Sequence, residues 1–231
     1  AAWAASPIMA RSSRTPKKLG EATITAAAPS ANPTTCAGSV SNSPPSTTTG
    51  PELTGRRYAR AMGYRLDDAD YVFVGQGSVV RDAEAVALWL REQRRIRVGV
   101  LNLAMFRPFP ADLVAELLAG KKGVVVLERT DQPLAVELPM IREIRAALAK
   151  AMENGRARGN RVPHPRVPAI GSDEIPEFYS AGFGFGSRDL QPEGIVGTVE
   201  NMLPDGAHKR LFYCSIDFIR DEPFTPKQEM F

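Results

Sequence analysis

From residue 71 onward, short apolar runs alternate with stretches in which apolar residues recur at helical spacing. The run at 71–74 (Tyr-Val-Phe-Val) ends at Gly75 and predicts a buried strand, because an unbroken apolar run needs cover on both faces. A helix is predicted next, with Ser78 as a candidate N-cap and an end near Glu92. Its apolar face consists of Ala83, Val86, Ala87 and Leu90.

The same alternation continues along most of the remaining chain. It predicts strands at 98–101, 123–127 and 210–219, and helices at 111–118, 134–151 and 192–201. A Gly- and Pro-rich stretch at 154–176 predicts a long loop. Strands that alternate with helices at this spacing favour right-handed βαβ units. We therefore predict an α/β fold, a three-layer domain with a mostly parallel sheet.

The first fifty residues differ in kind from the rest. They are rich in Ala, Ser, Thr and Pro and show no apolar periodicity, so they cannot bury enough surface to offset the entropy of ordering. We expect a disordered tail at 1–52, an α/β domain at 53–220 and a linker end at 221–231. The tail is interpreted as a frame-disrupted or fragment boundary, an organellar transit peptide or a flexible linker.

Charge and cysteine content narrow the functional classes. The chain has 29 Lys and Arg against 26 Asp and Glu, but residues 1–50 hold four of those cations and one of those acids. The rest is therefore neutral overall, and no nucleic-acid partner is expected. Cys36 and Cys214 are too few for an iron–sulfur cluster or a secreted disulfide framework. This cysteine usage leads us to expect a reducing, cytoplasmic compartment, with organellar import left open. No apolar stretch of 18 residues is present, so no membrane span is expected.

Two glycine-rich turns could meet phosphate groups. The turn at 75–78 follows a strand and opens a helix, as in dinucleotide-binding folds. Val80 stands where the third glycine of that motif would be, which favours a plain strand–helix turn, with a stand-alone nucleotide-binding module as the alternative. In the second turn, Gly182, Gly184 and Gly186 alternate with aromatic residues, so packing or an interdomain contact is favoured over phosphate binding.

Catalytic groups are sparse. His164 and His208, the two histidines, lie in polar loop-like stretches and pair with no nucleophile or metal-ligand pattern. Cys214 lies within the predicted strand at 210–219, where a buried, inert thiol is expected. No catalytic, cofactor-binding or metal-binding residue is therefore assigned.

Five short motifs, taken together, resemble one family. They occur in order as Leu-Thr-Gly-Arg-Arg-Tyr at 53–58, Asp-Ala-Asp-Tyr-Val at 68–72 with the turn at 77–78, Arg-Pro-Phe at 107–109, Val-Leu-Glu-Arg-Thr at 126–130 and Gly-Phe-Gly-Ser-Arg-Asp at 184–189. The order and content resemble pyruvate:ferredoxin (flavodoxin) oxidoreductases, within the 2-oxoacid:acceptor oxidoreductase family. The stretch at 53–218 is similar to the transketolase C-terminal-like domain of that family.

This resemblance implies oxidative decarboxylation of pyruvate or a related 2-oxoacid to an acyl-CoA. It also implies thiamine diphosphate, Mg²⁺ and [4Fe–4S] clusters, with ferredoxin or flavodoxin and coenzyme A as partners of the complete enzyme. The sequence departs from the family at Phe183 and Phe185, and in its longer, basic loop after the predicted helix at 134–151. Residues 204–206 (Pro-Asp-Gly) are not the Gly-Asp-Gly signature of diphosphate binding. The chain alone is therefore predicted to bind no cofactor and to be inactive.

The resemblance gives this domain a structural role and a place against other domains or subunits of the oxidoreductase. Arg107 could form a bidentate pair with a carboxylate or phosphate, and Glu128 and Arg129 lie at the end of a predicted strand, where ligands gather in open sheets. We interpret them as interface candidates, together with two residues of the second glycine-rich turn; the set is Arg107, Glu128, Arg129, Arg188 and Asp189. A pure interaction protein, whose basic tail meets acidic partners or directs import, is a third hypothesis.

Overall fold

The computed structural model describes residues 59–132, 134–157 and 162–214. The predicted tail at 1–52 and the predicted linker end at 221–231 lie outside these residues. Within them, no helix is both long and apolar enough to cross a membrane.

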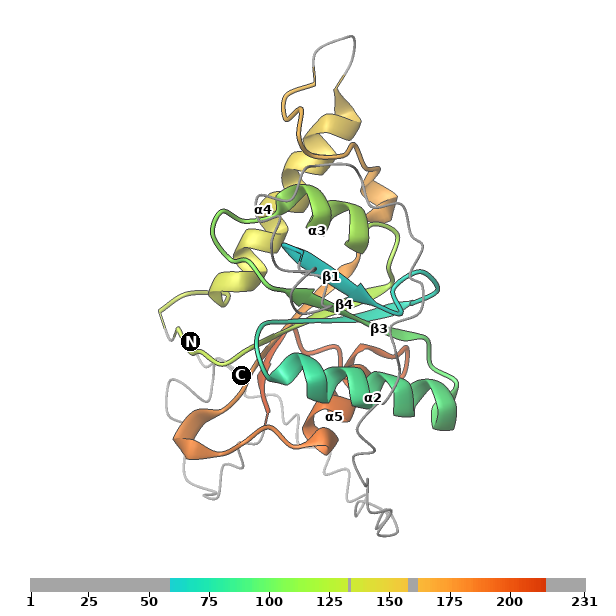
Figure 1. The fold of residues 1–231 in the computed structure, drawn as a ribbon, viewed down its shortest axis with the longest axis vertical. Coiled ribbons are helices and arrows are strands. Elements are labelled where there is room, and N and C mark those ends of the chain that lie inside the picture. The colour runs from blue at the N-terminus through green and yellow to red at the C-terminus, as the bar shows by residue number, and fades with distance from the viewer. Residues whose placement is uncertain (1–58, 133, 158–161, 215–231) are drawn as a thin grey trace, which may run out of the picture. The chain divides into compact units, whose positions relative to one another are not determined.

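The core of the domain is a six-stranded sheet with strand order β1-β3-β2-β4-β5-β6 (Figure 1). Its strands are β1 (Ala61–Tyr64), β2 (Tyr71–Gly75), β3 (Val98–Leu103), β4 (Gly123–Glu128), β5 (Glu177–Gly182) and β6 (Leu211–Tyr213). Strand β1 pairs antiparallel with β3, and all other neighbours pair in parallel. The predicted mostly parallel sheet is confirmed.

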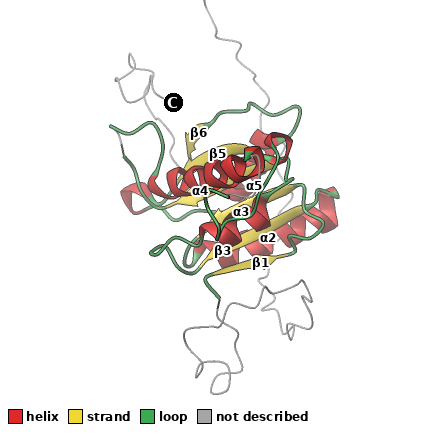
Figure 2. Ribbon diagram, turned by 90° about the horizontal axis from the view of Figure 1, so that it is seen from above, coloured by secondary structure: helices red, strands yellow, loops and turns green. Residues whose placement is uncertain are grey.

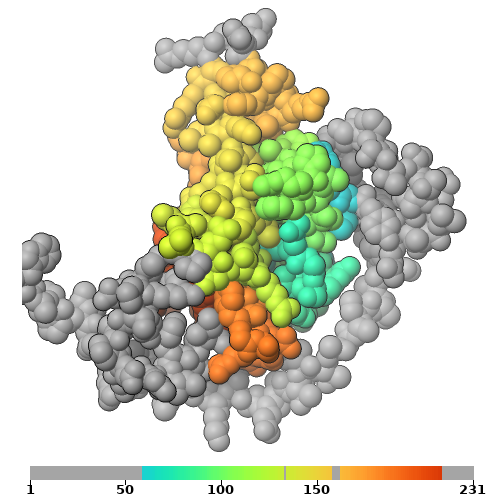
Figure 3. All heavy atoms as spheres, turned by 90° about the vertical axis from the view of Figure 1, so that its left-hand side faces the viewer, coloured from blue at the N-terminus to red at the C-terminus, as the bar shows by residue number. Residues whose placement is uncertain are grey.

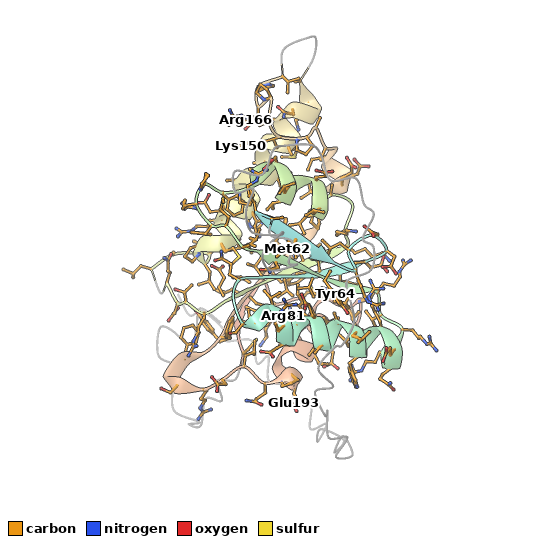
Figure 4. The ribbon with its side chains drawn as sticks, viewed as in Figure 1. Met62, Tyr64, Arg81, Lys150, Arg166 and Glu193 are labelled. Atoms are coloured by element: carbon orange, nitrogen blue, oxygen red, sulfur yellow. The ribbon has the colours of Figure 1, made fainter. Side chains whose placement is uncertain are left out.

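Helices cover both faces of this sheet. They are α2 (Val79–Arg94), α3 (Ala111–Leu118), α4 (Pro139–Arg156) and α5 (Pro192–Met202), with short 3-10 turns at Ser172–Glu174 and Phe185–Ser187. Figures 1 and 2 show α3 and α4 on one side and α2 and α5 on the other. In Figure 4, Met62 and Tyr64 mark β1 between Arg81 in the α2 layer and Lys150 in the α4 layer. The three-layer α/β prediction is therefore correct.

Alternation along the central strands divides the apolar interior into two cores. Val72 and Val74 of β2 face the core shared with α3 and α4, whereas Phe73 faces the core shared with α2 and α5. Val124 and Val126 of β4 follow the first pattern, and Val125 follows the second. Side chains of a strand point alternately to opposite faces, so both layers are anchored on the same two strands.

The sequence patterns located some elements well and missed others. The helix at 111–118 is observed with the predicted bounds, and β3, β4 and α2 each extend by one or two residues. Strands β1 and β5 were not predicted. The predicted helix at 134–151 is wrong at its start, since α4 begins at Pro139. Of the predicted strand at 210–219, residues 211–213 form β6 and those beyond 214 lie outside the described residues.

Candidate functional site: the carboxyl edge of the sheet

The parallel strands β2 to β6 all end at one edge of the sheet, called here the carboxyl edge. The chain leaves β2 through α2 to β3 on one side, and later returns through α3 to β4 on the other side of β2. Ligands of open α/β sheets gather at such a switch in direction. A hollow of about 330 Å³ lies there. Its lining residues are Gln76, Phe106, Leu127, Glu128, Arg129, Thr130, Pro139, Met140 and Phe183.

Glu128, the last residue of β4, points its carboxylate at the first turn of α4. The side-chain oxygens accept hydrogen bonds from the backbone N–H groups of Met140 at 2.7 Å and Ile141 at 3.3 Å. The residue is only 5% exposed. Burial raises the pKa of this carboxyl above its ordinary value, and the two backbone hydrogen bonds oppose that rise. Glu128 thus satisfies donors of a helix end that has no side-chain cap of its own.

Arg129 extends the same strand end into solvent and packs beside the second glycine-rich turn. It forms no ion pair or hydrogen bond with any described residue. Gly184 has φ +76°, and a Cβ there would lie 2.7 Å from Nε of Arg129. The positive φ favours glycine here, whereas the exposed, unbonded Arg129 side chain can move to make room for a Cβ. In the same turn, Phe185 packs edge-on against Tyr213 at 5.4 Å between ring centroids, so the packing interpretation holds for this aromatic residue.

Arg107 lies beyond β3, next to a cis peptide bond with Pro108. Its guanidinium lies 4.2 Å from the ring centroid of Phe106 and pairs with Glu143 of α4 at 2.8 Å. Arg107 therefore already has partners within the domain, although its side chain is 59% exposed.

The structure brings the five interface candidates to the carboxyl edge, onto which Figure 3 looks. They differ in what they contact there. Glu128 is buried and bonded internally, and Arg107 is paired with Glu143. Arg129, Arg188 and Asp189 are exposed, and none of their side chains forms an ion pair or hydrogen bond with a described residue. Their role at an interface stays a prediction, and for Glu128 the observed contacts are those of an internal helix cap.

One feature of this edge was missed by sequence reasoning. Residues that were predicted to open a helix instead form an irregular connection of a turn and bends between β4 and α4, in which Leu134 is 104% and Val136 is 88% exposed. The available signal was Pro139, since proline favours the first turn of a helix. In Figure 3 this connection (yellow-green) lies at the surface between α4 (yellow) and the segment that leads into α5 (orange).

The turn at 75–78 also ends on this edge. Gly77 has φ +74°, and the N–H of Val80 donates to the carbonyl of Gly77 at 3.3 Å. Ser78 is the N-cap residue of α2, as predicted, but it has helical φ and ψ and its side chain makes no capping bond. Val80 is 2% exposed and packs in the core, which explains its place where a dinucleotide-binding turn has glycine. The nucleotide-binding alternative has no test in this geometry.

The opposite edge, called here the amino edge, is held together by polar contacts. Asp70 pairs with Arg97 at 2.8 Å and with Lys122 at 3.4 Å, so residues that directly precede β2, β3 and β4 are linked. Burial disfavours ionisation of Asp70, but hydrogen bonds from the two cations outweigh it and hold the pKa of this carboxyl below its ordinary value. These contacts join three strand starts within the domain.

A second polar group at the amino edge includes one of the two histidines. Tyr179 donates its hydroxyl hydrogen to Glu177 at 2.5 Å, and the same oxygen lies 3.0 Å from Nδ1 of His208. Burial and the hydrogen bond to Glu177 raise the pKa of Tyr179 to about 12. The other histidine, His164, pairs with Glu153 at 2.7 Å near the end of α4. Both histidines lie in loops, as predicted.

The described residues do not fit the metal groups that the resemblance implies. No three His, Cys, Asp or Glu side chains within the described ranges converge into a metal-binding group. Cys214 is 6% exposed, and burial raises the pKa of its thiol to about 11, which disfavours the thiolate that an iron–sulfur cluster needs. Cys36 lies outside the described residues.

Comparison with known proteins supports the resemblance stated from the motifs. The family model for pyruvate:ferredoxin oxidoreductase core domain II matches residues 69–162. Pyruvate synthase subunit PorA of Thermotoga maritima is 33% identical over 152 residues, which are 66% of this chain and 33% of that subunit. A probable pyruvate-flavodoxin oxidoreductase of Escherichia coli is 28% identical over 144 residues, 62% of this chain and 11% of that protein.

A shorter match reaches a relative named for another 2-oxoacid. Ketoisovalerate oxidoreductase subunit VorA of Pyrococcus abyssi is 37% identical over 79 residues, 34% of this chain and 20% of that subunit. The chain thus spans about a third of the Thermotoga relative's length and about a tenth of the Escherichia relative's. Residues 69–162, most of the described α/β domain, therefore match core domain II of the pyruvate:ferredoxin oxidoreductase family, a transketolase C-terminal-like fold.

Proposed function

We propose that this chain supplies a structural and interdomain-contact module of a thiamine-diphosphate-dependent 2-oxoacid:ferredoxin oxidoreductase. The observation that carries the proposal is the match to core domain II in a chain that covers 33% of its Thermotoga relative. Three exposed charged residues without partners in the described domain, Arg129, Arg188 and Asp189, support a contact role for the carboxyl edge. They are the residues that a neighbouring domain or subunit would pair.

The reaction proposed for the complete enzyme converts pyruvate or a related 2-oxoacid to an acyl-CoA. Thiamine diphosphate with Mg²⁺ would supply the decarboxylation chemistry, and [4Fe–4S] clusters would pass electrons to ferredoxin or flavodoxin. We place these groups in other parts of the complete enzyme; within the described residues, no three His, Cys, Asp or Glu side chains converge into a metal-binding group. The role of this domain's residues is then to pack, pair and position.

The proposal keeps the boundaries expected from the sequence. The module would occupy residues 53–220, between the tail at 1–52 and a linker end at 221–231. A cytoplasmic location accompanies it, in line with the sparse cysteines of the chain.

An exchange experiment tests the proposal. The segment of Thermotoga PorA that matches this chain is replaced by the corresponding residues of this chain, and the chimera is co-expressed with the other subunits of that enzyme. We expect the chimera to assemble and to restore pyruvate- and coenzyme A-dependent reduction of a viologen dye, which PorA lacking the segment does not support. A chimera that neither assembles nor turns over would overturn the proposal.

The full chain by itself provides the complementary measurement. We expect no dye reduction with pyruvate or 2-oxoglutarate, and no heat of binding with thiamine diphosphate plus Mg²⁺ in isothermal titration. Dye reduction by the chain alone would contradict the proposal. A parallel titration with NAD addresses the nucleotide-binding alternative, which binding at the turn at 75–78 would promote.

A further inference from the structure

In the connection between β4 and α4, polar side chains are bonded to the domain and apolar side chains are exposed to solvent, which is the reverse of the usual arrangement. Its polar residues are bonded to the domain: Asp131 accepts a hydrogen bond from the hydroxyl of Tyr213 at 2.8 Å, and Gln132 accepts one from Arg142 at 2.8 Å. Glu137 pairs with Arg145 at 2.6 Å. Polar side chains thus fix this connection on both sides of its middle.

The middle of the connection presents apolar side chains to solvent. Leu134 and Val136, together called the apolar knob, are 104% and 88% exposed. Within the described residues, Val162 at 47% is the other exposed large hydrophobic side chain. Scattered apolar residues are normal on a surface, but two on one short, fixed segment indicate an interaction site.

The conformation of the apolar knob is already fixed in the free domain, before any partner binds. The N–H of Ala135 donates to the carbonyl of Gln132 at 2.9 Å, which closes a turn that includes Leu134. Leu138 is 2% exposed and fastens the end of the connection in the core. A segment fixed in this way loses little conformational entropy on docking, which suits an anchor.

We propose that the apolar knob docks into an apolar hollow, rimmed by carboxylates, on the part of the oxidoreductase that this chain does not span. The inference rests on the proposed function and names the contact. Arg129, exposed at the same edge and without a described side-chain partner, provides the charge that a carboxylate rim would complement, whereas the adjacent Asp189 offsets the charge of Arg188. A second copy of the chain is the alternative occupant, which the test below distinguishes.

The test compares variants of the PorA chimera by their assembly with the remaining subunits. Leu134→Ser and Val136→Ser are combined, and Val162→Ser serves as the matched control on another part of the surface. We expect the double variant to raise the dissociation constant for assembly by about a hundredfold, since burial of each side chain contributes roughly tenfold or more. Mass photometry over a dilution series measures it. Arg129→Gln should weaken assembly by a few fold and reduce its dependence on salt.

The outcomes separate this inference from the proposed function. If the chimera with the native connection fails to assemble, the proposed function falls and the inference with it. If it assembles and the double variant assembles equally well, the inference alone is overturned. Sedimentation would detect association of the full chain with itself. If the double variant abolished that association, the contact would be assigned to a second copy, and the inference would also be overturned. The full-length double variant should keep its melting temperature, because both side chains are exposed in the free domain.

Discussion

The two edges of the sheet differ in whether their charged side chains are paired within the domain. At the amino edge, residues directly before successive strands pair with one another, as Asp70 does with Arg97 and Lys122. At the carboxyl edge, Arg129, Arg188 and Asp189 have no partner among the described residues, and apolar side chains lie in solvent. Charged side chains at the amino edge are thus paired within the domain, whereas exposed side chains at the carboxyl edge are available to a partner.

This contrast separates residues that hold the fold from residues that are available to a partner. Glu128 shows that the separation is not simply positional, because it lies at the carboxyl edge and yet bonds to α4 in the interior. Removal of an internally bonded charge should destabilise the domain, and removal of an unpaired exposed charge should not. Substitutions of individual residues test this distinction.

The largest effect is expected for Glu128→Ala. The substitution leaves the N–H groups of Met140 and Ile141 without an acceptor in a buried place, so the free energy of unfolding should fall by about 2–4 kcal/mol. Urea unfolding of the full chain at pH 7 measures it. The control is Glu193→Ala on the exposed side of α5, with an expected change within about 0.5 kcal/mol. Equal effects of the two substitutions would contradict the internal role of Glu128.

Glu128→Gln tests the internal role of Glu128 through the pH dependence of the free energy of unfolding. The raised pKa of Glu128 means that the folded state binds its proton more tightly than the unfolded state does. Stability should therefore decline as the pH rises from the unfolded pKa, about 4.5, through the raised folded pKa. The glutamine variant keeps an acceptor for α4 but does not titrate, so this decline should be absent from its unfolding free energies. A decline of the same size in the variant would assign it to other groups.

Two glycines of the carboxyl edge form a matched pair. Gly184→Ala should lower the free energy of unfolding by about 1–2 kcal/mol, since displacement of the exposed Arg129 side chain adds to the strain of a positive φ. Gly77→Ala, with a similar φ and no atom within 4 Å of the new Cβ, should lower it by about 1 kcal/mol. Thermal unfolding of both variants gives the difference. If the two losses are the same, the Arg129 side chain moves aside without measurable cost.

The smallest effect is expected at the amino edge. Asp70→Asn should lower the free energy of unfolding by about 0.5–1 kcal/mol, because it weakens two partly exposed ion pairs. The lowered pKa of Asp70 makes this contribution present above about pH 3.8, and it is lost as the pH falls through the folded pKa. Asp189→Asn is the unpaired counterpart and should leave unfolding unchanged. A larger loss for Asp189 than for Asp70 would reverse the contrast between the edges.

Sequence patterns predicted the fold wherever one signal dominated. The helix at 111–118 follows two prolines that end the preceding segment, and its apolar face is continuous, so both ends were correct. Strand β4 is a dense β-branched run, and its interior was equally clear. In contrast, β5 mixes aromatic, small and charged residues (Glu-Phe-Tyr-Ser-Ala-Gly) after a proline-rich loop. Its strand conformation comes from pairing with β4 and β6, which local sequence does not encode.

The candidate site divides in the same way. Glu128 and Arg129 could be placed at a strand end from sequence, because the run before them is so regular. The Glu128 side chain points inward and the Arg129 side chain points outward. This difference depends on where α4 begins, and the predicted start of α4 was wrong by five residues. Leu134 shows why: an apolar residue before a helix is ordinarily assigned to the core, and only the tertiary contacts of its polar neighbours hold it outside.

The central position of β2 has a consequence for the order in which the chain can fold during its synthesis. Strand β2 lies between β3 and β4, so the sheet grows outward from it in both directions as later strands appear. Strand β1 leaves the ribosome first but must wait for β3, its pairing partner. The face beneath α3 and α4 is complete only after residue 156 has emerged. Until then, a nascent chain carries an uncovered apolar surface, the situation in which chaperones bind.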